Sequence, residues 1–300
     1  MIEGRIIKGV GGLYDVAGDD GAQYRVRAKG KFRRQGVSPL VGDRVRIAPE
    51  DQGDGWMEEI LPRRNQLARP AVANIDRLLL VAAPVPQVDL LLLDRLLLTA
   101  VTSDIEPLIL LNKTDLDDED LLARMQAAYS GCFPVLGIST VTGEGLDQVR
   151  TAMAGRVCCL AGQSAVGKSS LINALLPGLS LQTGSVSRMD RGRHTTRHAQ
   201  MLPTWQGGYV VDTPGFSLLA CGAMPPEDLA DGYPDYADLA EQCKFQVCLH
   251  DREPGCAVRA AVEAGSLDAG RYERYRVLLK EIQEKWRTAY DSHRTFPAGR

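Results

Sequence analysis

One segment constrains the fold of this chain more than any other, a glycine-containing loop that starts at Gly162. An apolar stretch over residues 157–161 precedes it, and a helical pattern over residues 171–176 follows it. This order predicts a phosphate-binding loop, because a backbone without Cβ can turn tightly enough to aim successive N–H groups at phosphate oxygens. We expect Lys168 to reach the β- and γ-phosphates and the Ser169 hydroxyl to bind Mg²⁺. The predicted loop residues are Gly162, Gln163, Ser164, Ala165, Val166, Gly167, Lys168, Ser169 and Ser170.

A second motif precedes this loop and favours GTP over ATP. Its sequence is Asn112-Lys113-Thr114-Asp115, and it follows an apolar run over residues 108–111. The Asp115 carboxylate can accept hydrogen bonds from N1–H and the exocyclic amine of guanine, a donor pair that adenine lacks. We expect Asn112 to support the base pocket and Lys113 to cover the base. The alternative is a helix cap, with Asp115 or Asp117 at the start of the next helix.

Two further loops complete the predicted nucleotide site. Ser139 and Thr140 follow an apolar run and match, more loosely, the remaining base-reading loop. Asp212 ends another apolar strand and opens the sequence D-T-P-G, which closes with Gly215. We expect Asp212 to hold Mg²⁺ through a water molecule and the Gly215 N–H to donate to the γ-phosphate.

The segment over residues 191–197 lies where a switch should supply a threonine for the metal. It contains Thr195 and Thr196, and the sequence leaves open which of them binds Mg²⁺. Phe216 stands where many GTPases have a water-positioning glutamine, and a phenyl ring cannot orient water. His194 is the candidate catalytic residue in its place, because histidine titrates near neutral pH. The alternative is that His194 contacts RNA phosphate beside the neighbouring arginines.

The order of the motifs sets this chain apart. In ordinary small GTPases the phosphate loop comes first and the N-K-x-D element late, whereas here N-K-T-D precedes the phosphate loop. Nucleotide sites are assembled from loops at strand ends, so a changed chain order can leave the chemistry intact. The pattern therefore predicts a circularly permuted GTPase domain.

Composition and periodicity predict an α/β protein in three parts. The chain has 300 residues, of which 44% are hydrophobic and 24% charged, as in ordinary globular proteins. Residues 1–66 show short alternating runs between turns, which predict an OB-type β-barrel. Residues 67–222 alternate apolar runs with helical stretches, which predict a mainly parallel sheet covered on both faces. Residues 223–300 carry a cysteine cluster and, over about 271–290, a helix whose apolar stripe we assign to core packing.

The cysteine cluster predicts a metal site. Its members form a C-x4-C-x-H-x5-C pattern and are Cys243, Cys248, His250 and Cys256. Three thiolates and one imidazole make a closed tetrahedral set, which favours one structural Zn²⁺ without an open position for chemistry. The alternative is a group of unligated side chains in a loop. Of the other cysteines, Cys158 and Cys159 are expected in the core, and Cys132 has no evident partner in the sequence.

Charge and targeting features bear on partners and location. No signal peptide or membrane-spanning stretch is recognisable, and the cysteine pattern favours a metal in a reducing compartment, so we expect a cytoplasmic protein without membrane contact. The net charge of −3 conceals residues 25–34, which contain six basic residues and no acidic one. This run favours RNA contact by a small margin over a solvated strand face. Nothing indicates a dedicated dimer interface, so we expect a monomer.

Taken together, these motifs resemble the RsgA (YjeQ/YloQ) family of circularly permuted GTPases. The resemblance covers essentially the whole chain: a barrel, N-K-x-D before G-Q-S-A-V-G-K-S, then D-T-P-G and the cysteine–histidine pattern, with G-R-H-T-T at residues 192–196. It implies a GTP hydrolase, binding GTP and GDP, that acts late in maturation of the 30S ribosomal subunit. It also implies contacts to 16S rRNA and stimulation of hydrolysis by the small subunit.

Two other functions compete with this one. The first is a GTP-dependent RNA-binding module in which hydrolysis is incidental. The second is a phosphotransferase that uses ATP, which Asp115 makes less favourable. In the leading interpretation the loop that begins at Asp212 leads into the C-terminal part, so we hypothesise that the GTP state repositions that part through this junction.

Overall fold

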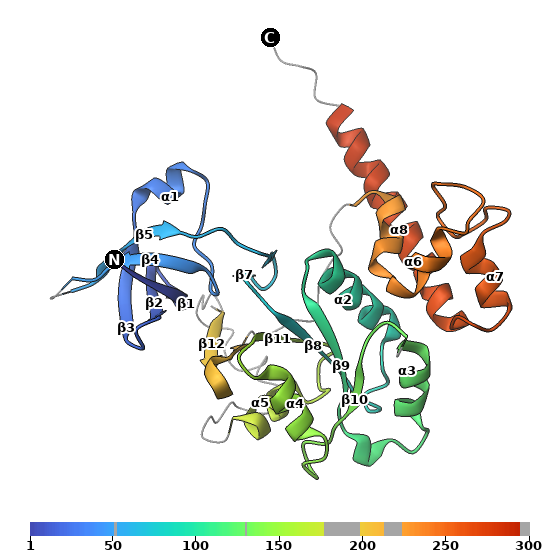
Figure 1. The fold of residues 1–300 in the computed structure, drawn as a ribbon, viewed down its shortest axis with the longest axis horizontal. Coiled ribbons are helices and arrows are strands. Elements are labelled where there is room, and N and C mark those ends of the chain that lie inside the picture. The colour runs from blue at the N-terminus through green and yellow to red at the C-terminus, as the bar shows by residue number, and fades with distance from the viewer. Residues whose placement is uncertain (51–52, 130, 177–198, 213–223, 295–300) are drawn as a thin grey trace, which may run out of the picture.

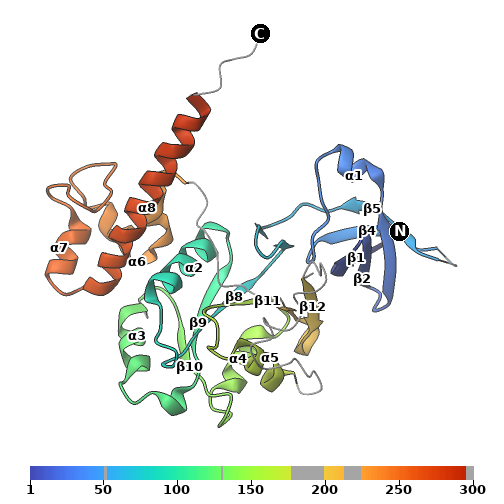
Figure 2. The same ribbon diagram turned by 180° about the vertical axis from the view of Figure 1, so that it is seen from behind.

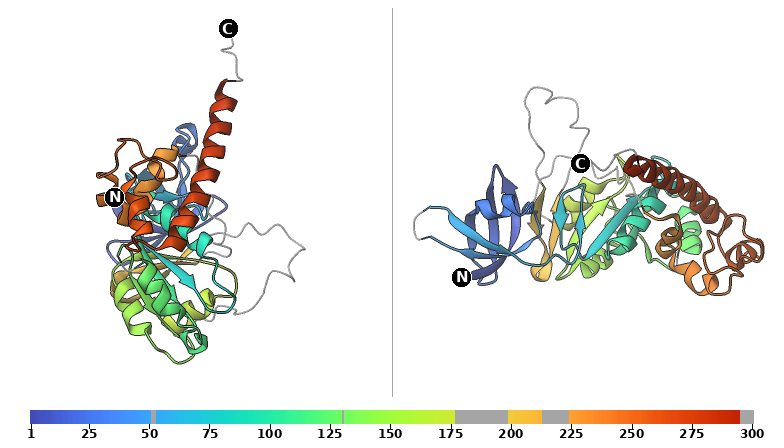
Figure 3. Two further views of the ribbon diagram at one scale, coloured as in Figure 1. Left: turned by 90° about the vertical axis from the view of Figure 1, so that its right-hand side faces the viewer. Right: turned by 90° about the horizontal axis from the view of Figure 1, so that it is seen from above.

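The structure of the chain is a computed structural model that describes residues 1–50, 53–129, 131–176, 199–212 and 224–294, with residues 212 and 289–294 as backbone only. Figure 1 shows three parts in a row: a barrel at one end, a sheet with helices in the middle, and a group of helices at the other end. The view from behind in Figure 2 and the view from above in Figure 3 show the same order.

The first part is a closed barrel of five strands, as the sequence predicts. The elements are β1 (Ile2–Val10), β2 (Leu13–Gly18), β3 (Gln23–Ala28), α1 (Gly30–Arg34), β4 (Arg44–Ala48) and β5 (Gly55–Ile60). β1 pairs with both β2 and β4, and β5 pairs with both β3 and β4, so the sheet closes on itself. Alternate residues point inward and are fully buried, among them Ile6, Val16, Val26, Val45 and Met57.

The middle part contains a mainly parallel sheet. Its strands are β8 (Arg77–Ala82), β9 (Glu106–Leu111), β10 (Val135–Gly137), β11 (Val157–Ala161), β12 (Gln200–Pro203) and β13 (Tyr209–Asp212), in the spatial order β10-β9-β8-β11-β13-β12. All neighbours in this sheet are parallel except β12 and β13. β12 is not predicted from the sequence, because this four-residue strand ends in a proline and lacks the apolar run of the others.

Helices cover both faces of this sheet. Their bounds are α2 (Leu90–Thr102), η1 (Thr114–Leu116), α3 (Leu121–Tyr129), α4 (Leu146–Met153), α5 (Lys168–Leu175) and η2 (Trp205–Gly207). Leu78 and Leu80 pack in one cluster with α2 and α3, whereas Leu79 and Val81 pack in another with α4 and α5. Strands buried on both faces explain why the sequence shows continuous apolar runs instead of alternation.

The barrel and the sheet are joined through backbone contacts. β1 pairs with the edge strand β12 at Lys8 and Gln200. The short strands β6 (Gln66–Leu67) and β7 (Val72–Ala73) pair with each other in the connection. Gly42 has φ +96°, and a Cβ there would lie 2.0 Å from the carbonyl oxygen of Ala73. Only glycine allows this close approach between barrel and connection.

The third part is helical. Its elements are η3 (Pro226–Gly232), α6 (Pro234–Ala240), α7 (Ala257–Glu263) and α8 (Ala269–Arg294), and the last turns of α8 extend beyond the rest of the molecule (Figure 3). The prolines that interrupt this segment begin η3 and α6, where a missing N–H is harmless. Of the predicted apolar stripe, Tyr272, Tyr275, Leu278, Leu279 and Ile282 are buried. Trp286 departs from the prediction because it is 40% exposed.

A buried polar cluster joins α2 and α3 to α8. Asp94 of α2 is 2% exposed, accepts a hydrogen bond of 2.6 Å from the Tyr129 hydroxyl, and forms an ion pair with Arg274. Burial raises the pKa of the Asp94 carboxyl, so its ionised form depends on the nearby guanidinium. A second interhelical ion pair joins Arg95 to Glu281.

Arg271 lies next to this cluster and contacts Cys132. It is 2% exposed, with its guanidinium 4.9 Å from the centre of the Tyr233 ring. It pairs with Asp235 and donates at 3.1 Å to the Cys132 sulfur. The sequence shows no evident partner for Cys132, and the structure supplies this one from a helix distant in sequence.

We predict that Arg274→Met destabilises the fold by about 3–5 kcal/mol, because it leaves the Asp94 carboxylate buried without its cation. Urea unfolding followed by circular dichroism measures the change. Arg252→Met is the matched control, since the Arg252 side chain is 83% exposed and we expect a change within about 0.5 kcal/mol. Equal stability of the two variants would contradict the prediction.

Candidate nucleotide site and metal centre

The phosphate loop between β11 and α5 requires glycine at two positions. Gly162 has φ +139°, and a Cβ there would lie 2.0 Å from the Val81 carbonyl oxygen of the neighbouring strand. Gly167 has φ +97°, and a Cβ there would lie 2.3 Å from Nδ2 of Asn112. The loop is therefore pressed against β8 and against the N-K-T-D element, and any side chain at either position would force the two apart.

Asn112 connects the loops that make up the candidate site. Its side chain is fully buried after β9, and Nδ2 donates to the Val166 carbonyl oxygen at 2.9 Å. Its Oδ1 accepts from the Thr140 N–H at 3.3 Å. One amide thus links the phosphate loop to the loop after β10. The structure brings together these three predicted elements, which lie far apart in the sequence.

Asp115 is held by Ser139, which the sequence places in the second base-reading loop. The buried Ser139 hydroxyl donates to Asp115 Oδ1 at 2.5 Å and accepts from the N–H groups of Val141 and Thr142 at 3.2 and 3.1 Å. Asp115 itself is exposed. The serine fixes one carboxylate oxygen, so the carboxylate is oriented before any base arrives.

The competing helix-cap interpretation applies to a different residue. Asp117 accepts from the backbone N–H groups of Leu121 and Leu122, each at 2.9 Å, at the start of α3. Because Asp117 fulfils this role, Asp115 is available for a base. The contacts of Asp115 and Asp117 thus assign different roles to the two residues.

Two lysines lie along the mouth of the site. Lys113 adopts a left-handed conformation with φ 64°, and its Nζ donates to the carbonyl oxygens of Ala165 at 2.8 Å and Val85 at 2.6 Å. Lys168 Nζ donates to the Gly162 carbonyl oxygen at 2.7 Å, and burial lowers its pKa. The exposed loop residues are Ser164, Ala165 and Ser169, the last at the first turn of α5.

The predicted metal and γ-phosphate contacts lie largely outside the described residues. This applies to His194, Thr195, Thr196 and Gly215. Asp212 ends β13, and its backbone is described. β13 is parallel to β11, so Asp212 and the phosphate loop leave the same edge of the sheet. That edge is where α/β sheets bind ligands.

The Gln163 side chain has a role that is not predicted from the sequence. Its Oε1 accepts from the Asp89 N–H at 2.9 Å, and its Nε2 donates to the Gln87 carbonyl oxygen at 3.2 Å. Asp89 caps α2 by accepting from the Leu92 N–H at 2.9 Å. Gln163 therefore joins the phosphate loop to the start of α2. This position is variable in the general loop pattern, so its identity gave no signal.

The four predicted metal ligands come together in the C-terminal part. The ligand atoms of Cys243, Cys248, His250 and Cys256 all lie within 4.8 Å of one another. His250 Nδ1 lies 3.6 Å from the Cys243 sulfur and 3.4 Å from the Cys256 sulfur, and these two sulfurs are 4.0 Å apart. Metal–ligand bonds of about 2.0–2.3 Å in a tetrahedron give separations of roughly 3.4–3.8 Å. The cluster can therefore hold a metal ion.

Neighbouring groups fix the loop that carries these ligands. The hydroxyls of Tyr272 and Tyr275 on α8 donate to the carbonyl oxygens of His250 and Leu249 at 2.8 and 2.9 Å. The Glu253 carboxylate accepts from three backbone N–H groups of the same loop. Burial lowers the pKa of His250, which favours the neutral imidazole that a metal requires.

Comparisons with known proteins agree with this geometry. A model of the RsgA GTPase family matches residues 60–221, and a model of the RsgA N-terminal domain matches residues 3–57. The chain is 44% identical over 293 residues to the small ribosomal subunit biogenesis GTPase RsgA of Shouchella clausii, covering 96% of this chain and 99% of that protein. It is 40% identical over 292 residues to the protein of the same name from Caldanaerobacter subterraneus, covering 96% and 98%.

Solved structures show the same arrangement. YjeQ from Thermotoga maritima has a TM-score of 0.84 and 36% sequence identity, with 94% of this chain and 98% of that chain covered. YloQ, described as a circularly permuted GTPase, has a TM-score of 0.81 and 36% identity, with 95% and 96% covered. Fold and motif order thus define a circularly permuted GTPase preceded by a barrel. The chain belongs to the RsgA GTPase family.

In the described parts of the chain, every helix is too short or too polar to cross a bilayer. The expected cytoplasmic location stays a prediction.

We predict that the purified chain holds about one zinc ion and that Cys243→Ser loses it, because three ligands no longer close the tetrahedron. Elemental analysis after gel filtration measures the zinc content. Cys132→Ser, which removes a thiol outside the cluster, should keep the metal. Equal zinc contents in the two variants would contradict the assignment.

Proposed function

We propose that this chain hydrolyses GTP in the cytoplasm during late maturation of the 30S ribosomal subunit, and that the subunit stimulates the hydrolysis. The observation that carries the proposal is the Asn112 side chain, which links the phosphate loop to the base-reading loop despite the permuted order. The relatives at 40–44% identity are named for small ribosomal subunit biogenesis. Their near full-length coverage supports the same role for this chain.

In the proposed site the phosphates are bound by the loop between β11 and α5. Backbone N–H groups of this loop and the Lys168 ammonium face the β- and γ-phosphates. Burial lowers the pKa of Lys168, and a charge interacts more strongly with phosphate in such a partly buried site than in water. The Ser169 hydroxyl and Thr195 or Thr196 are the proposed direct Mg²⁺ ligands, and Asp212 is proposed to hold the ion through a water molecule. The metal neutralises charge on the phosphates of bound GTP.

Base recognition is assigned to Asp115 and its support. Ser139 fixes one carboxylate oxygen, and Asn112 fixes the loop behind it. Guanine satisfies the carboxylate with two donors, whereas adenine would leave it unpaired and desolvated. This asymmetry favours GTP over ATP and argues against an ATP-dependent phosphotransferase.

Hydrolysis needs a group that orients the attacking water. His194 is the proposed candidate, because Phe216 replaces the glutamine of many GTPases. The alternative, in which His194 contacts RNA phosphate, predicts that its removal affects binding to the subunit and leaves the chemical step intact.

The barrel is the proposed contact with 16S rRNA, but only some of the basic residues within 25–34 are free to bind phosphate. Three of its cations form ion pairs with acidic residues of the barrel: Arg25 with Asp15, Arg27 with Asp54 and Lys29 with Glu58. Lys31, Arg33 and Arg34 belong to α1 and form no ion pair with any described residue. We therefore assign the electrostatic contact to α1.

Single-turnover GTP hydrolysis with and without purified 30S subunits tests the proposal. We expect slow hydrolysis alone and strong acceleration by the subunit, because a partner completes the catalytic arrangement in many GTPases. Absence of acceleration by 30S would favour the GTP-dependent binding module.

Asp115→Asn should transfer preference from GTP to xanthosine triphosphate, since its amide can donate to the xanthine 2-oxo group.

We predict that replacing Lys31, Arg33 and Arg34 by alanine lowers affinity for 30S by about tenfold or more and reduces its salt dependence, because three phosphate-facing cations are lost. The matched control is Arg25→Gln with Asp15→Asn, which deletes an ion pair at constant charge and should leave the affinity within about twofold. Sedimentation at two salt concentrations measures both. A larger loss of affinity in the control than in the α1 variant would assign the rRNA contact to the barrel strands instead.

A further inference from the structure

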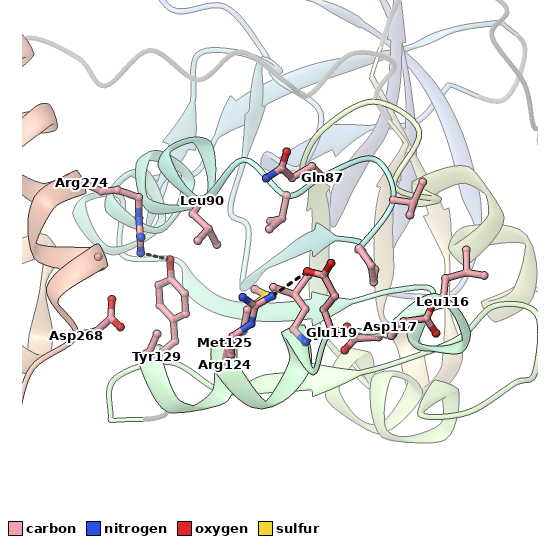
Figure 4. A pocket seen from close by; sticks show the side chains of 17 residues that line it. Gln87, Leu90, Leu116, Asp117, Glu119, Arg124, Met125, Tyr129, Asp268 and Arg274 are labelled. Carbon is pink, nitrogen blue, oxygen red and sulfur yellow. Dashed lines mark hydrogen bonds and ion pairs between the residues drawn. The ribbon is translucent and has the colours of Figure 1, made fainter.

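A groove opens beside the nucleotide site between α2, α3 and the start of α8. It has a volume of about 800 Å³ and is shown in Figure 4. One wall is the loop over residues 84–88 with Leu90, and the opposite wall is the segment over residues 116–129. Asn112, Lys113, Asp115 and Ser139 are not among its lining residues. The groove is therefore distinct from the base pocket, although it begins directly after Asp115 in the chain.

Part of the groove surface is apolar. Val85 is 57% exposed and Leu116 is 48% exposed, and both are among the large hydrophobic side chains that the fold leaves accessible. Leu90, Leu121 and Met125 also line the groove and are less exposed. Contiguous exposed apolar side chains with a polar border mark contact sites on globular proteins.

The border of the groove is acidic. Its carboxylates belong to Asp117, Asp118, Glu119 and Asp268, and its guanidiniums to Arg124 and Arg274. Arg274 points to Tyr129 in Figure 4 and is already paired with Asp94 outside the groove. Arg124 lies 3.8 Å from Glu119, and both of these side chains are largely exposed. The carboxylates therefore dominate the charge that a ligand would meet.

We propose that this acidic, apolar groove binds a basic peptide segment with apolar side chains, contributed by a protein of the small ribosomal subunit. A phosphate backbone is disfavoured because the carboxylates would repel it. A peptide with lysine or arginine beside leucine- or valine-like side chains places its cations against the carboxylates of the border and its apolar side chains against the apolar part of the groove. The inference rests on the proposed function, since it takes the small subunit as the partner.

Contacts with the nucleotide site give this groove a route to the reaction. The loop over residues 84–88 is held from one side by Lys113, which donates to the Val85 carbonyl oxygen at 2.6 Å. From the other side Gln163 of the phosphate loop donates to the Gln87 carbonyl oxygen at 3.2 Å. A base-reading residue and a phosphate-loop residue thus share one wall with the bound peptide. A peptide bound in the groove therefore influences the positions of both Lys113 and Gln163.

Site-specific photocrosslinking to purified 30S subunits identifies the occupant. Arg124, which lines the groove, is replaced by p-benzoylphenylalanine, and the matched control carries the same group at Ala123, an exposed residue of α3 outside the lining. We expect position 124 to give an adduct with a ribosomal protein that resists ribonuclease and is several times more abundant than at position 123. An adduct with 16S rRNA, or equal yields at the two positions, overturns the proposal.

Charge reversal separates a peptide from RNA by the sign of the effect. Asp118→Lys should lower the affinity for 30S by about threefold if the occupant is basic, and raise it if the occupant is RNA. Asp147→Lys on α4 is the control, because its side chain is 94% exposed on a helix remote from the groove. Both variants should bind GDP as the unaltered chain does, since neither side chain forms a hydrogen bond or ion pair with the described residues of the nucleotide loops.

The same samples distinguish failure of this inference from failure of the proposed function. If the unaltered chain cosediments with 30S and the subunit accelerates its hydrolysis, but neither groove test gives the expected result, the groove assignment alone is wrong. If the unaltered chain neither cosediments nor responds to 30S, both proposals fall.

Discussion

The side chain of Asn112 is the contact on which the candidate site depends. Asn112 is 54 residues from Val166 of the phosphate loop and 28 residues from Thr140 of the second base-reading loop, so tertiary contacts must join these loops. Asn112 does this with both ends of one amide, to Val166 and to Thr140. It is fully buried, so neither hydrogen bond can be exchanged for water. The requirement for glycine at position 167 follows from the same contact.

Permutation changes what the nucleotide loops are attached to, while the sheet keeps its parallel core. The barrel reaches the sheet through β12, the strand that follows residues 177–198 in the chain. The C-terminal part reaches it through α2 and α3, by way of Asp94, Tyr129 and Arg274. The barrel and the C-terminal part therefore contact different elements of the GTPase part, with the nucleotide loops between them.

Sequence predicted the elements whose signal is local. The parallel strands, the helices of the middle part, the closed barrel and the gathering of four metal ligands all follow from apolar runs, turns and ligand spacing. The sequence missed features made between distant residues, namely β12, the Arg271–Cys132 contact and the bridge from Gln163 to Asp89. Such contacts depend on tertiary proximity, and a single chain carries no periodic signal for them. The exposed Trp286 departs from its stripe because α8 continues past its neighbours.

The helix α2 alters the hypothesis that the GTP state acts on the C-terminal part only through the segment after Asp212. Gln163 of the phosphate loop contacts the capping residue Asp89 at the start of α2. Further along the same helix, Asp94 and Arg95 pair with residues of α8. A rigid helix transmits a displacement of one end to the other, so a shift of the phosphate loop has a direct mechanical path to the metal-binding part. Because a buried ion pair tolerates little change in geometry, α2 and α8 are expected to move as one body.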